Sequence, residues 1–163
     1  MDIEKYINLY GRDLTRLCMS LCQSRSDAED LYQSTWEKAM RHFRRYNREK
    51  PFDKWLFAIC VNTYKDMVKS PFHKRIIRFD KAEDLERTIN SIPADENISR
   101  EEILSLHNAI SKLTADKRQV IALYYFKDYG TKEVAEILSI PEGTVKSRLN
   151  SARQDLRKEL NHE

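Results

Sequence analysis

Cations and small polar residues recur along one face of residues 142–158, which hold five lysines and arginines against two acids. Val145, Leu149, Ala152 and Leu156 return at the period of a helix and mark the opposite, apolar face. A helix with one basic face suits the major groove of DNA. The chemistry predicted for this segment is therefore DNA recognition through hydrogen bonds and ion pairs.

The outward face of this segment carries the candidate contacts to DNA. The first residues of such a helix reach base edges, while flanking cations and hydroxyls hold phosphates. Gly143 has no side chain and would let the backbone approach closely. An ordinary solvated surface helix is the alternative explanation. Candidate base contacts are Glu142, Lys146, Ser147 and Asn150, and candidate phosphate contacts are Thr144, Arg148 and Arg153.

A short amphipathic helix must precede and support this recognition segment. Val134 and Leu138 fall on one helical face, and Thr131 is a suitable N-cap after Gly130, which supplies backbone freedom. Residues 139–141, which read Ser-Ile-Pro, end that helix. Two helices separated by so short a turn predict a helix-turn-helix.

A second candidate site lies in residues 43–52, called here the basic-aromatic loop. Cations can follow phosphates while aromatic faces stack on unpaired bases, each stack contributing about 1 to 3 kcal/mol. The alternative is that the aromatic residues belong to the core and the arginines only solubilise the turn. The interleaved residues are Phe43, Tyr46 and Phe52 with Arg44, Arg45, Arg48 and Lys50, and Arg41 just before the loop belongs to the same set of cations.

Three helices are expected around this loop. Apolar residues at helical spacing predict the first over residues 3–21. Ser26 with Glu29 three residues later forms a capping box for the second, and Pro51 is favoured in the first turn of the third. The third helix presents polar and basic residues, among them Asn62, on the side away from its apolar stripe.

Two further helices are expected before the helix-turn-helix. Ser99 and Glu102 form a capping box, and Thr114 caps the helix that follows. Three glycines and four prolines in 163 residues argue against a sandwich or barrel of strands. The predicted fold class is all-α, with two small helical domains.

Charge divides the chain into three parts. Residues 1–79 carry a net charge of +6, residues 80–102 carry −5, and residues 103–163 carry +2. The acidic segment has few large apolar residues, which is typical of a flexible linker, although a local helix over residues 80–89 fits its pattern. The expected domains are residues 1–70 and 100–163, joined by a linker over 71–99.

Catalytic chemistry has no visible constellation in this chain. Cys18, Cys22 and Cys60 lack the spacing of a zinc site and are expected to be small apolar core residues. Three unpaired cysteines suit a reducing cytoplasm. No basic leader, apolar signal segment or run of 18 apolar residues is present, so neither export nor membrane spanning is expected. We expect no enzyme, metal or cofactor.

Several segments of this sequence resemble those of a known family, the extracytoplasmic-function (ECF) sigma factors of bacterial RNA polymerase. The segment D-A-E-D-L-Y-Q-S-T-W-E-K-A, which begins at Asp27, is similar to the region-two helix that docks on polymerase. The segment W-L-F-A-I-C-V-N-T-Y-K-D, which begins at Trp55, is similar to the helix that opens and reads the minus-ten element. Residues 113–126 and 142–149 are similar to region four, which reads the minus-thirty-five element.

The resemblance implies roles for individual residues. Core polymerase binding is expected at Asp27, Asp30, Leu31 and Gln33. Minus-ten DNA binding is expected at Arg45, Tyr46, Asn47, Arg48, Lys50, Phe52, Trp55, Asn62 and Lys65. Minus-thirty-five DNA binding is expected at Thr131, Glu142, Gly143, Thr144, Lys146, Ser147, Arg148, Asn150 and Arg153.

Partners follow from the same resemblance. The chain is expected to bind core RNA polymerase, through the beta-prime clamp helices and the beta flap, together with promoter DNA. An anti-sigma factor is also implied. The acidic linker, by resemblance, could occupy a basic channel of the polymerase. The alternative from another functional class is a stand-alone helix-turn-helix regulator, which would leave the basic-aromatic loop unexplained.

Overall fold

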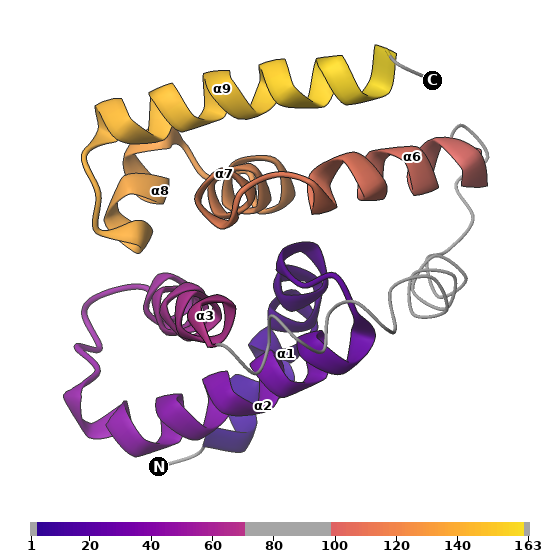
Figure 1. The fold of residues 1–163 in the computed structure, drawn as a ribbon. Helices are drawn as coiled ribbons and strands as arrows, with labels where there is room; N and C mark the ends of the chain where they lie inside the picture. The colour runs from indigo at the N-terminus through magenta and orange to yellow at the C-terminus, as the bar shows by residue number, and fades with distance from the viewer. Residues whose placement is uncertain (1–2, 71–98, 162–163) are drawn as a thin grey trace.

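The computed structural model of the protein describes residues 3–70 and 99–161, and all regular structure in these two ranges is helical (Figure 1). The predicted all-α class is therefore confirmed there. The suggested helix over 80–89 lies outside the described residues, as does most of the expected linker. The elements are α1 (Ile3–Leu21), α2 (Arg25–His42), η1 (Phe43–Arg45), α3 (Phe52–Lys69), α6 (Arg100–Ser111), α7 (Ala115–Ile121), the π-helix η2 (Ala122–Phe126), α8 (Thr131–Leu138) and α9 (Glu142–Asn161).

Helices α1, α2 and α3 form an N-terminal bundle in which α2 packs against both of the others. Leu14, Leu17 and Leu21 of α1 are fully buried, as are Leu31 of α2 and Leu56 of α3. The three leucines of α1 follow one another at steps of three and four residues, which is the pattern that predicted this helix. Burial of such side chains contributes about 1.5 to 3 kcal/mol each, which makes this core the main stabilising feature of the bundle.

The start of α2 differs from the prediction. Ser24 is the N-cap, and its hydroxyl oxygen accepts a hydrogen bond from the backbone N–H of Asp27 at 3.1 Å. The predicted capping box of Ser26 and Glu29 is therefore wrong. Glu29 instead pairs with Arg25, whose Nε lies 3.1 Å from Glu29 Oε1. Each serine is followed three residues later by an acid, so the local pattern fits two starting points and α2 uses the earlier one.

The caps predicted for the C-terminal helices are confirmed at two positions. Ser99 and Glu102 exchange hydrogen bonds in a reciprocal capping box at the start of α6. Thr114 accepts a hydrogen bond from the backbone N–H of Lys117 at the start of α7. Each cap satisfies a backbone donor that has no partner inside its helix.

Helices α8 and α9 form the predicted helix-turn-helix and pack on each other. Val145, Leu149 and Ala152 are buried, as their spacing predicted. Ser139 ends α8 in the left-handed region, with φ of 55°. Asn, Asp and Gly enter this region more readily than serine, so a tight turn dictates the conformation of Ser139.

The start of α8 corrects two expectations. Gly130 is the N-cap with φ of −66°, a conformation open to any residue, so the turn does not use the freedom of glycine. Thr131 is the first helical residue and not the N-cap. Its hydroxyl donates a hydrogen bond to Glu142 Oε1 at 2.8 Å and thereby ties the start of α8 to the start of α9.

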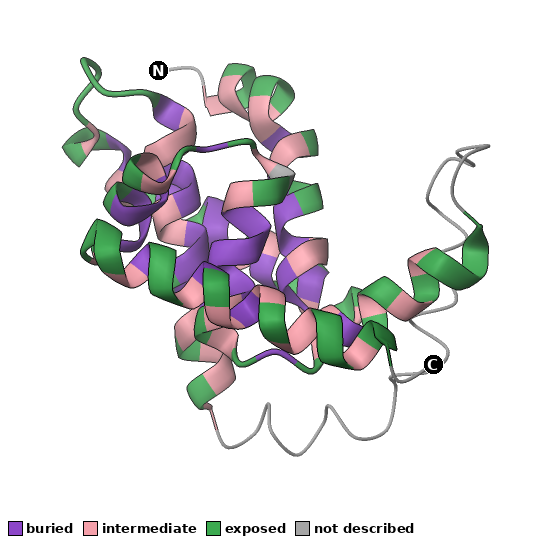
Figure 2. Cartoon of the chain, turned by 90° about the horizontal axis from the view of Figure 1, so that it is seen from above, coloured by how far each residue is buried: buried purple, intermediate pink, exposed green. Residues whose placement is uncertain are grey.

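The two sets of helices pack together around one continuous core. Helix α3 contacts α7 and α8, and α1 contacts α7 and η2. Buried residues gather where the two sets meet (Figure 2). We call this packing of α1 and α3 against α7, η2 and α8 the closed arrangement.

Candidate nucleic-acid and polymerase interfaces

The basic-aromatic loop divides its aromatic residues between two roles. Phe43 and Phe52 are buried, and the Phe52 ring stacks on Tyr6 with 4.2 Å between centroids. Tyr46 and Trp55 are only partly buried, with their ring centroids 5.0 Å apart. The core interpretation therefore holds for the two phenylalanines, while Tyr46 and Trp55 keep accessible faces. Phe52 was expected among the minus-ten DNA-binding residues, but its ring is buried and supports the loop from the core.

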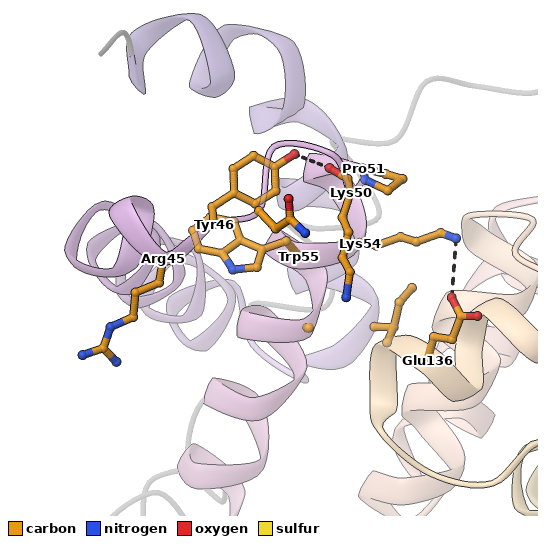
Figure 3. A pocket seen from close by; sticks show the side chains of 10 residues that line it. Arg45, Tyr46, Lys50, Pro51, Lys54, Trp55 and Glu136 are labelled. Carbon is orange, nitrogen blue, oxygen red and sulfur yellow. Dashed lines mark hydrogen bonds and ion pairs between the residues drawn. The ribbon is translucent and has the colours of Figure 1, made fainter.

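An open pocket of about 700 Å³ lies beside these accessible aromatic faces (Figure 3). The Tyr46 hydroxyl donates to the carbonyl oxygen of Lys50, and Asn47 Oδ1 accepts the N–H of Glu49 at 3.1 Å, so the loop is held by its own side chains. The pocket is lined from the N-terminal half by Arg45, Tyr46, Asn47, Lys50, Lys54 and Trp55, and from α8 by Glu136 and Ile137.

The geometry of this pocket suits an unpaired nucleotide. Arg45 and Lys50 are exposed cations, Trp55 offers a ring face, and Asn47 carries an amide that can pair with base edges. Arg48 lies over the Phe43 ring at 6.0 Å from its centroid. Arg45, Tyr46, Asn47, Lys50 and Trp55 are thus brought together at one pocket, whereas Arg48 does not line it.

The remaining minus-ten candidates lie further along α3. Asn62 is exposed and Lys65 is half-buried, and neither lines the pocket. They follow Trp55 by seven and ten residues on the same helix, which is two and nearly three turns. A strand that left the pocket along α3 would meet them in order.

The polymerase-binding candidates on α2 are separated by burial. Asp30 and Gln33 are exposed, and Asp27 is half-buried in the first turn of the helix. Leu31 is fully buried in the bundle core. In this conformation Leu31 supports α2 from inside and cannot touch a partner, which corrects its expected role as a contact.

The base-facing candidates on α9 are all exposed. Glu142, Lys146, Ser147 and Asn150 occupy the first turns of the helix, and Gly143 lies beside them. Glu142 accepts the hydrogen bond from Thr131, and Lys146 Nζ lies 3.7 Å from its Oε1. The hydrogen bond from Thr131 and the charge of Lys146 lower the pKa of Glu142, so the start of α9 presents a carboxylate.

Two of the three phosphate candidates on α9, Arg148 and Arg153, already have partners within the chain. Arg148 Nη2 lies 3.9 Å from Asp116 Oδ2, while Thr144 is half-buried. Arg153 Nε donates to the Tyr125 hydroxyl at 2.6 Å, and its guanidinium lies over the rings of Tyr124 and Tyr125. A phosphate would have to replace or share these contacts, so Arg148 and Arg153 are less available than the sequence suggested.

Comparison with known proteins identifies the two halves separately. Residues 6–71 match the family described as Sigma-70 region 2, and residues 103–156 match Sigma-70, region 4. The chain is also 31% identical over 157 residues to the ECF RNA polymerase sigma factor SigM of Bacillus subtilis, with 96% of this chain and 94% of that protein covered. This chain belongs to the ECF sigma-factor family.

Other ECF sigma factors align over similar lengths. SigW of Bacillus subtilis is 28% identical over 161 residues, covering 94% of this chain and 86% of that protein. Two solved structures share the fold. The sigma factor RpoE in complex with the anti-sigma factor NepR from Bartonella quintana has a TM-score of 0.75 at 24% identity, covering 98% of this chain and 97% of that chain. CnrH in complex with the cytosolic domain of CnrY has a TM-score of 0.71 at 22% identity, covering 98% and 88%.

Sequence reasoning missed a buried arginine between region two and region four. Arg118 of α7 is only 7% exposed and donates five hydrogen bonds. Nη1 donates to the Tyr64 hydroxyl at 2.7 Å and to the carbonyl of Leu21 at 3.2 Å. Nε and Nη2 donate to the carbonyls of Ile110, Ser111 and Leu113 at 3.2, 2.6 and 2.8 Å. The one available signal is the position of Arg118 beside the apolar stripe of α7.

The cysteines of this ECF sigma factor are core residues. Cys18, Cys22 and Cys60 are all buried free thiols, as predicted, with Cys18 Sγ 3.8 Å from Cys60 Sγ. The hydrogen bond with Cys60 and burial raise the pKa of Cys18, and burial raises that of Cys22. Both therefore stay protonated and unreactive at neutral pH.

The described residues hold neither a metal cluster nor a membrane-spanning helix. Within residues 3–70 and 99–161, no group of three or more His, Cys, Asp or Glu side chains is placed to hold a metal ion. Across the same ranges, no helix combines the length and the apolar character needed to cross a membrane.

Proposed function

We propose that this protein is a promoter-specificity subunit that binds core RNA polymerase and directs transcription initiation at alternative promoters, with no catalytic chemistry of its own. The observation that carries this proposal is the presence of both sigma regions in one chain. A helix-turn-helix alone would support many DNA-binding functions. The pocket beside the basic-aromatic loop adds a site for unpaired DNA. A polymerase subunit that opens promoter DNA needs such a site, whereas a protein that reads only duplex DNA does not.

Region two is proposed to bind polymerase and to capture one melted strand. Asp30 and Gln33 of α2 are exposed side by side for a protein partner. Unstacking DNA costs a few kcal/mol per step, and stacking of a base on Tyr46 or Trp55 offsets that cost. The proposed domain for both tasks comprises residues 1–70.

Region four is proposed to read the minus-thirty-five element as duplex DNA. Lys146, Ser147 and Asn150 lie at the start of α9, where the recognition helix of this motif enters the major groove. Thr131 positions Glu142 on the same surface. The proposed domain comprises residues 100–163 and follows a linker over 71–99.

The partners of the relatives suggest the setting of this protein. RpoE was solved in complex with the anti-sigma factor NepR, and CnrH with the cytosolic domain of CnrY. An anti-sigma factor that sequesters this chain is therefore part of the proposal. The beta-prime clamp helices and the beta flap are the proposed polymerase surfaces. Because polymerase works in the cytoplasm, the protein is proposed to be cytoplasmic.

Run-off transcription with purified core polymerase tests the proposal. Genomic fragments are transcribed with and without this protein, and new transcripts with defined starts are expected only in its presence. Tight duplex binding by the protein alone, with no polymerase-dependent transcript, would instead favour a stand-alone helix-turn-helix regulator.

Charge reversal on α2 sharpens that test. Asp30→Lys places a cation on the proposed polymerase surface, and we expect at least a tenfold loss of transcript because like-charge contacts at an interface cost several kcal/mol. The matched control is Glu4→Lys, an exposed reversal on α1. Circular dichroism verifies that both variants fold. Unchanged polymerase binding by Asp30→Lys would remove α2 from the proposed interface.

A further inference from the structure

Three side chains converge where α8 and α9 begin, on the surface proposed to read duplex DNA. The Thr131 hydroxyl donates to Glu142 Oε1 at 2.8 Å, although the two residues belong to different helices. Lys146 Nζ lies 3.7 Å from the same oxygen and comes from the next turn of α9. The carboxylate is therefore held from two sides, while the side chains of Glu142 and Lys146 stay 44% and 65% exposed.

Thr131 supports the carboxylate without using up its capacity to accept hydrogen bonds. An ionised carboxylate only accepts, through two oxygens with about four lone-pair sites, so one bond from Thr131 leaves room for an external donor. The hydrogen bond from Thr131 and the charge of Lys146 lower the pKa of Glu142, which keeps this acceptor ionised at neutral pH. Thr131 itself is half-buried, so the exposed pair is better placed to meet a ligand.

Gly143 leaves the backbone next to this pair uncovered. Its φ is negative, and a Cβ placed there would meet nothing within 4 Å, so neither backbone conformation nor space within the described chain requires a glycine. Glycine in a helix is less favourable than alanine by up to about 1 kcal/mol. A surface outside the protein that approaches the backbone closely beside Glu142 explains this choice of residue.

One kind of base pair matches the exposed pair of groups. In the major groove, C·G presents the N4 amino donor of cytosine beside the O6 and N7 acceptors of guanine. N4 and O6 are hydrogen-bonded to each other at about 2.9 Å, and Oε1 of Glu142 and Nζ of Lys146 are 3.7 Å apart, so the two pairs of atoms have similar spans. An A·T pair also sets a donor beside acceptors, but the thymine methyl lies next to one of them, and adenine is read best by amide side chains.

We propose that Glu142 and Lys146 together read a single C·G pair of the minus-thirty-five element, and that Thr131 is the positioning residue that holds the carboxylate for cytosine N4. This inference rests on the proposed function and deepens it, because it names the base pair and the atoms. Thr131 makes no base contact in this arrangement. A side chain that is ordered before binding loses less conformational entropy when the base arrives, which is how Thr131 contributes to selectivity.

Randomised promoter DNA locates the base pair. A promoter obtained by run-off transcription keeps its minus-ten element while its minus-thirty-five segment is randomised, and the duplexes bound by holoenzyme are sequenced. We expect the wild-type protein to prefer C·G at one position by at least about fivefold. Glu142→Met and Lys146→Met should each reduce the preference at that same position. No C·G preference, or losses at two different positions, would overturn the proposal.

The matched control makes the same change at the other end of α9. The Glu159 side chain is 42% exposed and also pairs with a lysine, since Lys112 Nζ lies 2.9 Å from its Oε2. Glu159→Met should keep the base preference of the wild-type protein. If Glu159→Met and Glu142→Met changed the preference alike, the effect would belong to the charge of α9 as a whole, and the assigned base contact would be wrong.

Conservative variants test the positioning role of Thr131. Thr131→Ser keeps the hydroxyl and should keep the preference for C·G, whereas Thr131→Val keeps the shape but should reduce that preference by about threefold or more. In the Glu142→Met background, Thr131→Val should add nothing, because the group that it positions is gone. Circular dichroism verifies that every variant folds. Weaker binding of Thr131→Val to all sequences alike would indicate a structural role only and would overturn the positioning role.

A modified base isolates the proposed hydrogen bond. In N4-methylcytosine, a methyl group replaces the amino hydrogen that faces the groove, while the hydrogen that pairs with guanine remains. By fluorescence anisotropy, this base at the identified position should weaken binding of wild-type holoenzyme at least about fivefold, and that of the Glu142→Met holoenzyme by less than about twofold. Equal losses would overturn the contact between Glu142 and N4. Absence of any polymerase-dependent transcript from the wild-type protein would instead overturn the proposed function.

Discussion

The two proposed DNA-reading surfaces differ in what covers them. At the start of α9, Lys146, Ser147 and Asn150 are exposed in the closed arrangement. On region two, the pocket beside Trp55 is bounded on one side by α8, and the neighbouring stripe of α3 is buried. The proposed duplex-reading surface is therefore left open, while the surface proposed to bind melted DNA is partly covered.

Composition explains this difference. A duplex reader needs charged and hydroxyl groups, which water solvates well without any protein cover. A reader of unpaired bases needs aromatic and apolar faces, whose exposure to water is unfavourable. Region two thus has more to gain from an internal partner than region four does. The following predictions test that asymmetry, beginning with the largest expected effect.

Replacement of Arg118 should destabilise the whole closed arrangement. Arg118→Met keeps much of the apolar volume but leaves the Tyr64 hydroxyl and four carbonyl oxygens without this donor. We expect a loss of about 3 to 5 kcal/mol in the free energy of unfolding, measured by urea denaturation. Arg157→Met, at an exposed position of α9, is the control and should change stability by less than about 0.5 kcal/mol. A loss below about 1 kcal/mol for Arg118→Met would mean that packing alone holds the domains.

Substitutions on the two reading surfaces should affect different DNA. Tyr46→Leu keeps apolar bulk against Trp55 but removes an aromatic face, and it should weaken holoenzyme binding to single-stranded minus-ten DNA by about 1 to 3 kcal/mol. Lys146→Ala should weaken binding to minus-thirty-five duplex by about 1 to 3 kcal/mol. Fluorescence anisotropy with each oligonucleotide measures both effects, and each variant serves as the control for the other. Equal losses on both oligonucleotides would contradict the separation of the two surfaces.

Tyr129→Phe should loosen the domain contact slightly. The Tyr129 hydroxyl donates to Asp53 Oδ2 at 2.5 Å, and its loss leaves that acceptor unpaired. We expect about 1 kcal/mol lower stability, with a larger effect on the domain contact than on either helix bundle. Hydrogen exchange of α3 and α8 amides would locate the change, and an effect spread evenly over all helices would contradict it.

The stability of the protein at alkaline pH gives a separate test of Tyr129. Burial, followed by the hydrogen bond to Asp53 and its charge, raises the pKa of Tyr129 well above its usual value near 10. The unfolded chain therefore loses this proton first, so the stabilising effect is complete below about pH 10 and declines as pH rises further. Above about pH 10, the free energy of unfolding of the Tyr129→Phe variant should fall less steeply with pH than that of the wild-type protein, by up to about 1.4 kcal/mol per pH unit. Asp53→Asn removes the charge and should give an intermediate slope.

Local features of the fold followed from local sequence. The reciprocal cap at Ser99 and Glu102 and the stripe Val145, Leu149, Ala152 depend on residues within a few turns of each other, so pattern and capping chemistry predicted them. The start of α2 was mistaken because Ser24 and Ser26 offer the same pattern. A cap depends on backbone conformation as well as on residue type, and the sequence does not distinguish two neighbouring serines.

The aromatic residues of the basic-aromatic loop illustrate a partial prediction. Interleaved cations and rings indicated a candidate site, and Arg45, Tyr46, Asn47 and Lys50 do gather at a pocket with Trp55. Which rings are buried could not be predicted, because Phe52 is covered by Tyr6 and Tyr10 of α1, more than 40 positions earlier in the chain. The roles of single residues in DNA and polymerase binding remain predictions.

The sequence by itself determined the helices, the helix-turn-helix and the likeness to sigma factors, because each depends on spacing within one segment. Only the tertiary structure decided that Arg118 pairs with Tyr64, 54 positions away, and that Tyr129 pairs with Asp53, 76 positions away. Periodicity reveals that a face of α3 is buried, but it carries no information about which distant helix covers it. That choice depends on shape and on the pairing of buried polar groups, which exist only once the chain has folded.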